Sequence, residues 1–191
     1  MASSPFFSGS VSVILLFALL FTGTHTMVTA NVPSILPVCK TVSGLVDPEF
    51  CLEALGSDGR SVSAGMDYRT YSIIAVDLLT ANATSTATKI DGLLREGGSR
   101  DDDATTRCLR SCQALYSGIV QTQPSVQAAI NDKRDGEAAS SLETSASAAM
   151  ECEDGFGKNN VASPVTAEDK NAFQLAKLAI ALLTKTATHN E

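Results

Sequence analysis

Clustered carboxylates are the first candidates for chemistry in this chain, because a pair of carboxyl groups can hydrolyse a glycosidic bond. One cluster is Asp101–Asp103, and the other consists of Glu151, Glu153 and Asp154. The three aspartates precede a predicted helix, whose dipole and solvation are sufficient to explain them. The sequence also contains no Gly-x-Ser-x-Gly elbow and no phosphate-binding loop. The residues therefore indicate no acid/base pair, and we expect neither enzymatic activity nor a cofactor.

Cysteines are the second candidates, because thiolates bind metals and pairs of thiols form disulfides. The chain has five cysteines: Cys39, Cys51, Cys108, Cys112 and Cys152. A zinc site is not expected, because Cys108 and Cys112 lack a second closely spaced pair and His189 lies at the C-terminal end. Five is an odd number, so at least one thiol stays free or pairs with another molecule.

The composition indicates a globular, helical protein. Of the 191 residues, 44% are hydrophobic and 18% are charged, which is typical of a folded domain. Aromatic residues make up only 5% and tryptophan is absent, which favours helices over long β-sheets. The formal net charge of −7 argues against nucleic acid as a partner, because phosphate backbones select basic surfaces.

The first 30 residues are predicted to be a signal peptide. Residues 11–21 are an uncharged apolar run that is too short to span a bilayer, and Val28-Thr29-Ala30 provides small residues for cleavage after Ala30. The remainder suits one domain and contains no second long apolar run. We therefore expect a secreted protein with no membrane association after cleavage, in a compartment that permits disulfides.

Four segments place apolar or small residues at alternating spacings of three and four, which is typical of amphipathic helices. The first is expected from about Val62 to Leu94, with a stop at Gly97-Gly98. Its inward stripe is predicted to be Met66, Ile73, Val76, Thr80, Ala83, Ala87, Ile90 and Leu94.

The second segment is expected to begin at residues 99–103, where a hydroxyl and carboxylates suit a helix N-terminus. Pro124 is predicted to interrupt it. A short restarted helix through Val126 and Ile130 would then end at Asp135-Gly136.

The third segment is expected to end at Gly155 and Gly157, after an inward stripe with regular spacing. That stripe consists of Ala138, Leu142, Ser145, Ala149, Cys152 and Phe156. Ser163-Pro164 and a predicted capping box, Thr166-x-x-Asp169, open the fourth segment. Its inward residues are expected to be Phe173, Ala176, Ile180 and Leu183.

Four such helices with short connections predict an antiparallel four-helix bundle over residues 58–191, with crossing angles near ~20°. Residues 31–57 form a smaller unit, hinged at Gly44 and Asp47-Pro48, with a cysteine in each half. This pattern predicts an N-terminal helical hairpin, so that the whole domain, residues 31–191, is all-α. A bridge between Cys39 and Cys51 would stabilise the hairpin by roughly 3 kcal/mol in the chain-entropy model.

The bundle cysteines allow two pairings. Cys112 and Cys152 both lie on inward stripes, and a bridge between them would stabilise the bundle by roughly 4 kcal/mol and leave Cys108 free. The alternative is a bridge from Cys108 to Cys152, with Cys112 buried as a small apolar residue.

Characteristic residues accompany four of the cysteines. They are Cys39, Phe50-Cys51, Cys112-Gln-Ala-Leu-Tyr116, and Ser147-Ala-Ala149 leading to Cys152-Glu-Asp-Gly-Phe156. With Ser163-Pro-Val-Thr166, this set resembles the plant invertase and pectin methylesterase inhibitor family, and within it the branch of invertase inhibitors that includes pollen allergens. The match spans nearly all of the chain after the predicted signal peptide.

The resemblance implies a disulfide-stapled helical hairpin, a four-helix bundle and no catalysis. It also implies the pairs Cys39–Cys51 and Cys112–Cys152, with Cys108 as the free thiol. Invertase inhibitors of this family can insert a Pro-Lys-Phe tripeptide, from the turn before the third bundle helix, into the active-site cleft of their target. The corresponding turn here reads Lys133-Arg-Asp-Gly-Glu137, without the tripeptide.

We therefore expect a secreted inhibitor that blocks the substrate cleft of a plant acid invertase in the cell wall or vacuole. Lys133, Arg134, Asp135, Gly136 and Glu137 are the candidate contact residues, and a basic turn of this kind could pair with an acidic cleft. Because the tripeptide is absent, pectin methylesterase is the alternative target.

Two hypotheses propose functions other than enzyme inhibition. The small residues Ala83, Ala87, Ala149 and Ala176 could line a cavity for an apolar ligand, which would make the protein a carrier. The fold could also persist as a structural or allergenic pollen protein without inhibitory activity. Separately, Asn82-Ala-Thr84 is an N-glycosylation sequon, which makes Asn82 the expected glycosylation site; this requires Asn82 to face outward, and helical spacing allows it.

Overall fold

The computed structural model describes residues 32–96 and 103–189, and within these ranges every regular element is a helix. The elements are α2 (Val32–Val42), α3 (Pro48–Gly56), the 3₁₀ turn η1 (Gly59–Val62), α4 (Tyr68–Glu96), α5 (Ala104–Asn131), α6 (Asp135–Lys158) and α7 (Thr166–His189). The predicted signal peptide with its cleavage site and the predicted stop at Gly97-Gly98 lie outside the described residues. None of the described helices is long and apolar enough to cross a membrane.

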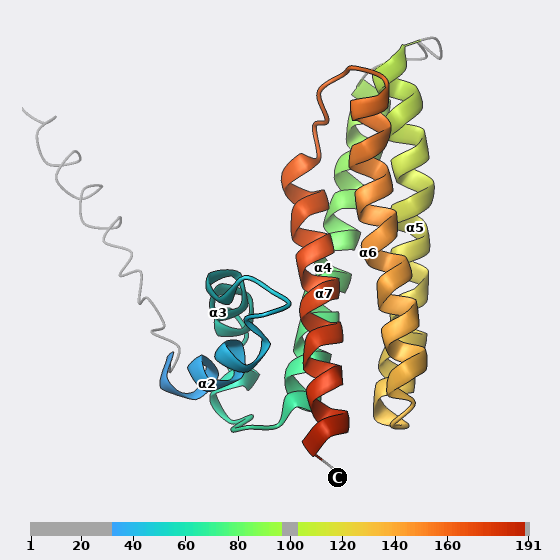
Figure 1. Cartoon of the computed structure of the whole chain (residues 1–191). Coiled ribbons are helices and arrows are strands. Elements are labelled where there is room, and N and C mark those ends of the chain that lie inside the picture. Colours follow the sequence, from blue (N-terminus) through green and yellow to red (C-terminus); the bar gives the residue numbers. More distant parts are fainter. Residues whose placement is uncertain (1–31, 97–102, 190–191) are drawn as a thin grey trace, which may run out of the picture.

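Helices α4 to α7 form an antiparallel bundle, and α2 and α3 form a hairpin beside one end of it (Figure 1). Within the bundle, α4 packs against α5 and α7, and α6 packs against the same two helices. The hairpin lies next to α4 and α7, away from α5 and α6. This arrangement confirms the predicted all-α class and its two parts.

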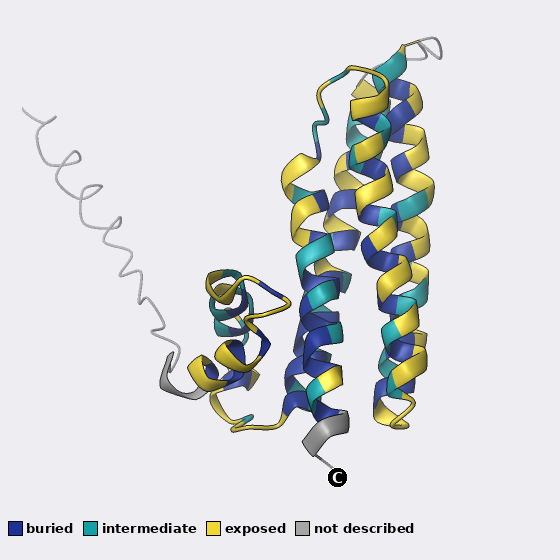
Figure 2. Ribbon diagram, viewed as in Figure 1, coloured by how far each residue is buried: buried dark blue, intermediate teal, exposed yellow. Residues whose placement is uncertain are grey.

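The core fills the space between the four long helices, where the buried faces of the ribbons meet (Figure 2). Its largest fully buried side chains are Tyr71, Tyr116, Phe156, Leu55, Ile74, Leu79, Ile90, Ile119, Ile130, Leu142, Leu178 and Leu182. Alanines such as Ala83, Ala149 and Ala176 are packed within this core, which lets the helices approach closely. This packing gives no support to the hypothesis that these alanines line a cavity for an apolar ligand.

A disulfide and a capped turn build the hairpin. Cys39 of α2 and Cys51 of α3 are bonded, with their Cα atoms 5.6 Å apart. Asp47 caps α3 by accepting hydrogen bonds from the backbone N–H groups of Glu49 and Phe50. Pro48 follows as the first helical residue, where its missing N–H costs nothing.

The hairpin is joined to the bundle through η1. Ser61 donates a hydrogen bond to the carbonyl of Leu55, and Tyr71 of α4 donates one to the carbonyl of Ser61. Arg60 forms an ion pair of 2.7 Å with Asp77 of α4. The hairpin therefore has a covalent bond of its own, and its buried side chains, such as Val38 and Leu55, belong to the same core as the bundle.

Two boundaries of α4 and α5 differ from the prediction. Helix α4 begins at Tyr68, because Val62 belongs to η1 and Met66 is half exposed. Pro124 does not interrupt α5, which continues to Asn131. The ring of Pro124 is exposed, while Gln123 and Val126 beside it are buried, so tertiary packing on both sides of the proline holds the helix together.

The predicted boundaries of α6 are also wrong. Asp135-Gly136 does not end a helix but begins α6, and the chain reverses at Asp132–Arg134. Gly155 and Gly157 lie inside α6, which ends at Lys158, because the buried Phe156 between them anchors the last turn to the core.

The predicted capping box of α7 is absent. Asp169 turns into the core, and Thr166 hydrogen-bonds to Glu153 of α6 instead. The stripe on α4 is likewise rotated, because Ile74 and Leu79 are fully buried while Ile73 and Thr80 are only partly so.

Candidate functional site

The turn between α5 and α6 holds the candidate contact residues, and its backbone is fixed by helix-terminating hydrogen bonds. The N–H of Lys133 donates to the carbonyl of Ile130 at 3.1 Å, and the N–H of Arg134 donates to the carbonyl of Ala129 at 2.8 Å. This is a Schellman motif, in which the residue at Lys133 has a positive φ, here 60°. Glycine is the usual residue there, so a lysine is held in a left-handed conformation.

The charges in this turn are unequally paired. Arg134 forms ion pairs with Asp132, at 3.1 Å, and with Glu137. Lys133 is exposed and has no ion pair or hydrogen bond from its ammonium group within the described chain. The tip of the turn therefore offers the unpaired ammonium group of Lys133, next to the guanidinium of Arg134, which is already in ion pairs.

The carboxylate of Asp135 points into the bundle and not toward the surface that would contact a target enzyme. It accepts hydrogen bonds from Arg69 of α4 at 2.7 and 2.9 Å, and from Thr186 of α7 at 3.2 Å. The same guanidinium donates to the carbonyl of Ile130 in α5. Arg69 thus ties the end of α5 and the start of α6 to the other two helices, and its hydrogen bonds hold the pKa of Asp135 below its usual value.

The remaining candidate contact residues lie at the surface. Gly136 is exposed, with nothing near the position where a Cβ would stand. Glu137 is exposed, and its carboxylate forms an ion pair with Arg134. Of the five predicted contact residues, the structure therefore brings four to the surface and turns Asp135 inward as a positioning residue.

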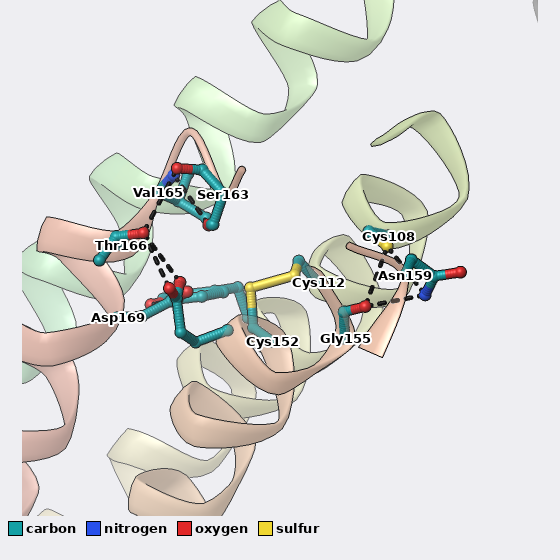
Figure 3. The surroundings of a disulfide bond; sticks show 11 residues. Cys108, Cys112, Cys152, Gly155, Asn159, Ser163, Val165, Thr166 and Asp169 are labelled. Carbon is teal, nitrogen blue, oxygen red and sulfur yellow. Dashed lines mark hydrogen bonds between the residues drawn. A yellow bond between two sulfur atoms is a disulfide. The ribbon is translucent and has the colours of Figure 1, made fainter. Parts of the chain in front are cut away.

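A second centre lies at the opposite end of the bundle, around the bridge between Cys112 of α5 and Cys152 of α6, whose Cα atoms are 4.8 Å apart. Figure 3 shows Cys108, Gly155 and Asn159 on one side of this bridge, and Asp169 and Thr166 on the other. Cys108 is free and buried; its thiol donates to the carbonyl of Gly155 at 3.4 Å. The pairing matches the first of the two alternatives that the sequence left open.

Asp169 is a buried carboxyl group at this centre. It is 2% exposed and accepts a hydrogen bond of 2.6 Å from the hydroxyl of Tyr116, which is fully buried. Its Oδ2 has no hydrogen-bond partner among the described residues. Burial, with a smaller contribution from the nearby carboxylate of Glu153, raises the pKa of Asp169 to about 7 against the lowering effect of the Tyr116 hydrogen bond.

The buried side chains of this second centre join helices to one another. Tyr116 comes from α5, Glu153 from α6 and Asp169 from α7, while Lys89 of α4 pairs with Glu168 at 2.6 Å beside them. Burial and the Asp169 carboxylate raise the pKa of Tyr116, so the phenol stays protonated. The cluster joins all four helices at one level.

The described members of the two acidic clusters lie at separate places and are held by structural contacts or exposed. Asp103 is the N-cap of α5 and accepts from the N–H of Thr106 at 3.2 Å, while residues 101 and 102 lie outside the described chain. Glu151 and Asp154 are exposed, whereas Glu153 is half-buried against Thr166. No group of three or more metal-ligating side chains occurs in the part of the chain that the structure describes.

Asn82, the acceptor residue of the sequon, faces the space between α3 and α7. It is half-buried and lines a groove of about 600 Å³ between α3, α4 and α7, which we call the hairpin groove. Its Oδ1 is buried and has no hydrogen-bond partner within the described residues.

The sequence did not indicate two sets of contacts that position the helices, those of Arg69 and those of the Tyr116–Asp169 pair. Arg69 and Asp135 are 66 positions apart in the sequence, and the residues next to Arg69 in the sequence do not indicate this contact. Asp169 gives the same local pattern whether its carboxylate caps the helix or enters the core.

Comparisons with known proteins assign the family. A family model described as "Plant invertase/pectin methylesterase inhibitor" matches residues 33–182. A relative from Platanus orientalis with the name "Putative invertase inhibitor" is 35% identical over 152 residues, covering 75% of this chain and 84% of the relative. A relative of the same name from Platanus acerifolia is 34% identical over 152 residues, covering 75% and 80%.

A solved structure agrees with the fold. The crystal structure of a mutant form of a pectin methylesterase inhibitor from Arabidopsis superposes with a TM-score of 0.65 at 18% identity, covering 79% of this chain and 96% of that one. At this identity the similarity concerns the fold alone. From the match over most of its length and from its relatives, this chain belongs to the plant invertase/pectin methylesterase inhibitor family.

Proposed function

We propose that the protein is a secreted inhibitor that blocks the substrate cleft of a plant acid invertase in the cell wall or vacuole, by binding and without chemistry of its own. The names of the two plane-tree relatives support invertase as the target. The observation that carries the proposal is the α5–α6 turn, where Lys133 presents a free cation from a rigid support.

The chemistry of the target explains why a cation at this position is useful. Glycosidases cleave their substrates with a pair of carboxyl groups in the cleft, so that cleft favours a positive charge. Lys133 would enter it, while Arg134, held by Asp132 and Glu137, would stay at the rim. Because Arg69 and the Schellman hydrogen bonds fix the turn before binding, little conformational entropy is lost on association.

Pectin methylesterase is the second candidate target. One specific observation favours it, namely that the turn lacks the Pro-Lys-Phe tripeptide with which invertase inhibitors enter the cleft. A rigid bundle face could cover an esterase cleft without such a tripeptide.

Inhibition assays on both enzymes test the proposal. The chain without its predicted signal peptide is mixed with acid invertase or with pectin methylesterase, and residual activity is measured. Lys133→Ala is compared with Lys158→Ala, which removes the same charge from an exposed site at the opposite end of α6. We expect invertase inhibition, weakened about tenfold or more by Lys133→Ala and unchanged by Lys158→Ala.

Each other result would count against part of the proposal. Inhibition of pectin methylesterase alone, with invertase unaffected at about 10 µM protein, would replace the target by the alternative. Equal effects of the two lysine variants would remove the turn from the interface. Inhibition of neither enzyme would contradict the inhibitory function itself.

A further inference from the structure

The hairpin groove has the lining of a saccharide site. Its apolar lining comes from Phe50 and Ala54 of α3, Leu78 of α4 and Leu175 of α7. Its polar lining consists of Glu53, Ser57, Asn82, Ser85, Thr86, Glu168, Lys170, Asn171 and Gln174. An aromatic ring beside amides, hydroxyls and carboxylates suits a polyhydroxylated ligand, and a volume of about 600 Å³ lies in the range of pockets that hold small organic ligands.

Three side-chain amides in this groove have no partner. Asn82, Asn171 and Gln174 make no side-chain hydrogen bond among the described residues. Outside the groove, five side-chain amides donate within the chain, namely Gln113, Gln121, Gln123, Gln127 and Asn159, whereas the exposed Asn131 and Asn160 do not. Among the three amides of the groove, only the Oδ1 of Asn82 is buried without a partner, and an unpaired buried atom beside an open groove is consistent with a missing ligand.

Asn82 is also the acceptor residue of the sequon Asn82-Ala-Thr84. Of its two amide atoms, Oδ1 is buried without a partner and Nδ2 is not, and the residue lines the groove. The half-burial of Asn82 in the fold does not prevent modification, because the modifying enzyme acts on the chain before it folds. The fold must then accommodate the attached sugar, and the neighbouring positions Leu79, Ala83 and Thr86 are fully buried and could not.

We infer that an N-linked glycan on Asn82 occupies the hairpin groove, with its first sugars against Phe50 and hydrogen-bonded to Asn171 and Gln174. In the transfer, Nδ2 of Asn82 forms a bond to the anomeric carbon of an oligosaccharide and loses a proton. The bond from that carbon to the diphosphate of a polyprenyl-diphosphate donor breaks, and the diphosphate leaves. This inference uses the secretory route of the proposed function and no feature of the inhibitory turn.

Such a glycan would tie the hairpin to the bundle. Phe50 belongs to α3, whereas Asn171 and Gln174 belong to α7, and Asn82 to α4. A sugar in contact with all three helices would add to the packing of α2 and α3 on α4 and α7 and to the contacts through η1. The carbohydrate therefore acts as a structural ligand between the helices and does not extend freely into solvent.

The test uses the full chain expressed in human secretory cells. Intact mass of the secreted protein measures occupancy, and Thr84→Ser, which keeps the sequon, is compared with Thr84→Ala, which removes it without touching Asn82. We expect glycan on the natural chain and on Thr84→Ser, and none on Thr84→Ala. Hydrogen exchange of residues 48–56 should be about tenfold slower with the glycan than without it, the effect of one or two net hydrogen bonds.

The position of the glycan is tested by peptide N-glycosidase F. We expect release from the native protein to be about tenfold slower than from the denatured protein, since a buried linkage must open first. Asn171→Ala with Gln174→Ala should speed native release, whereas the matched change Gln121→Ala outside the groove should not. A secreted chain with unmodified Asn82, no secretion at all, or equal native and denatured release would overturn the inference. Invertase inhibition, measured on the same samples, reports separately on the proposed function.

Discussion

The buried carboxyl group of Asp169 predicts an unusual dependence of stability on pH. Its pKa is about 7 in the folded protein, against a value of 3.8 for an ordinary aspartate. Between these two values the folded state holds a proton that the unfolded state has released. The free energy of unfolding must therefore fall as pH rises through this window, by about 1.4 kcal/mol per pH unit at most.

The magnitude follows from the window. Between about pH 5 and pH 7 the loss of stability from this group alone should be about 2 to 3 kcal/mol, and it should level off above about pH 8, where the folded group has also lost its proton. Asp58 and Asp135 act in the opposite direction, because hydrogen bonds from Arg60 and Arg69 lower their pKa values. Their contribution is lost only as the pH falls below about 4, so it leaves the window of Asp169 undisturbed.

Asp169→Asn is the decisive variant, because an asparagine has nearly the same shape, can still accept the hydrogen bond from Tyr116 and does not titrate. Urea denaturation with both disulfides intact should give a wild-type stability that falls between about pH 5 and pH 7, and a variant stability that stays nearly flat, with a difference of up to about 3 kcal/mol. Parallel curves for the two proteins across this range would refute the reasoning.

Three further predictions concern the turn, its clamp and the bridge. Lys133→Gly should raise the free energy of unfolding by about 1 kcal/mol, because glycine adopts the positive φ without strain, while inhibition weakens; a lower melting temperature would contradict this. Arg69→Met should lower the free energy of unfolding by about 2 kcal/mol in urea titrations, because Asp135 loses its bidentate partner; wild-type stability would contradict the clamp. Replacing Cys112 and Cys152 by alanine should cost about 4 kcal/mol in the same assay, from the entropy of the unfolded chain, and a loss under 1 kcal/mol would refute this estimate.

The bundle could be predicted from the sequence because spacings of three and four residues select one face of a helix. Cys112 and Cys152 were placed on facing stripes by this rule, and the structure bonds them. Helix ends were predicted less well, because Pro124, Gly155 and Gly157 are local breakers whose effect is overridden by buried neighbours such as Val126 and Phe156.

The candidate site could be located from the sequence, but its geometry could not. The turn lies where the resemblance implies, yet Asp135 faces inward because Arg69, distant in sequence, reaches it. The orientation of Asp169 and the closure of α3 over Asn82 depend in the same way on contacts between separate helices. Local pattern fixes which residues share a face, and only tertiary packing fixes what each one meets.

Steady-state kinetics of acid invertase at varied sucrose concentration test the central claim most directly, that the protein occupies the substrate cleft through its α5–α6 turn. We predict competitive inhibition, in which the apparent KM rises with inhibitor concentration while kcat is unchanged, and in which Lys133→Ala weakens the effect. A fall in kcat at constant KM, or no inhibition at any sucrose concentration, would contradict the account.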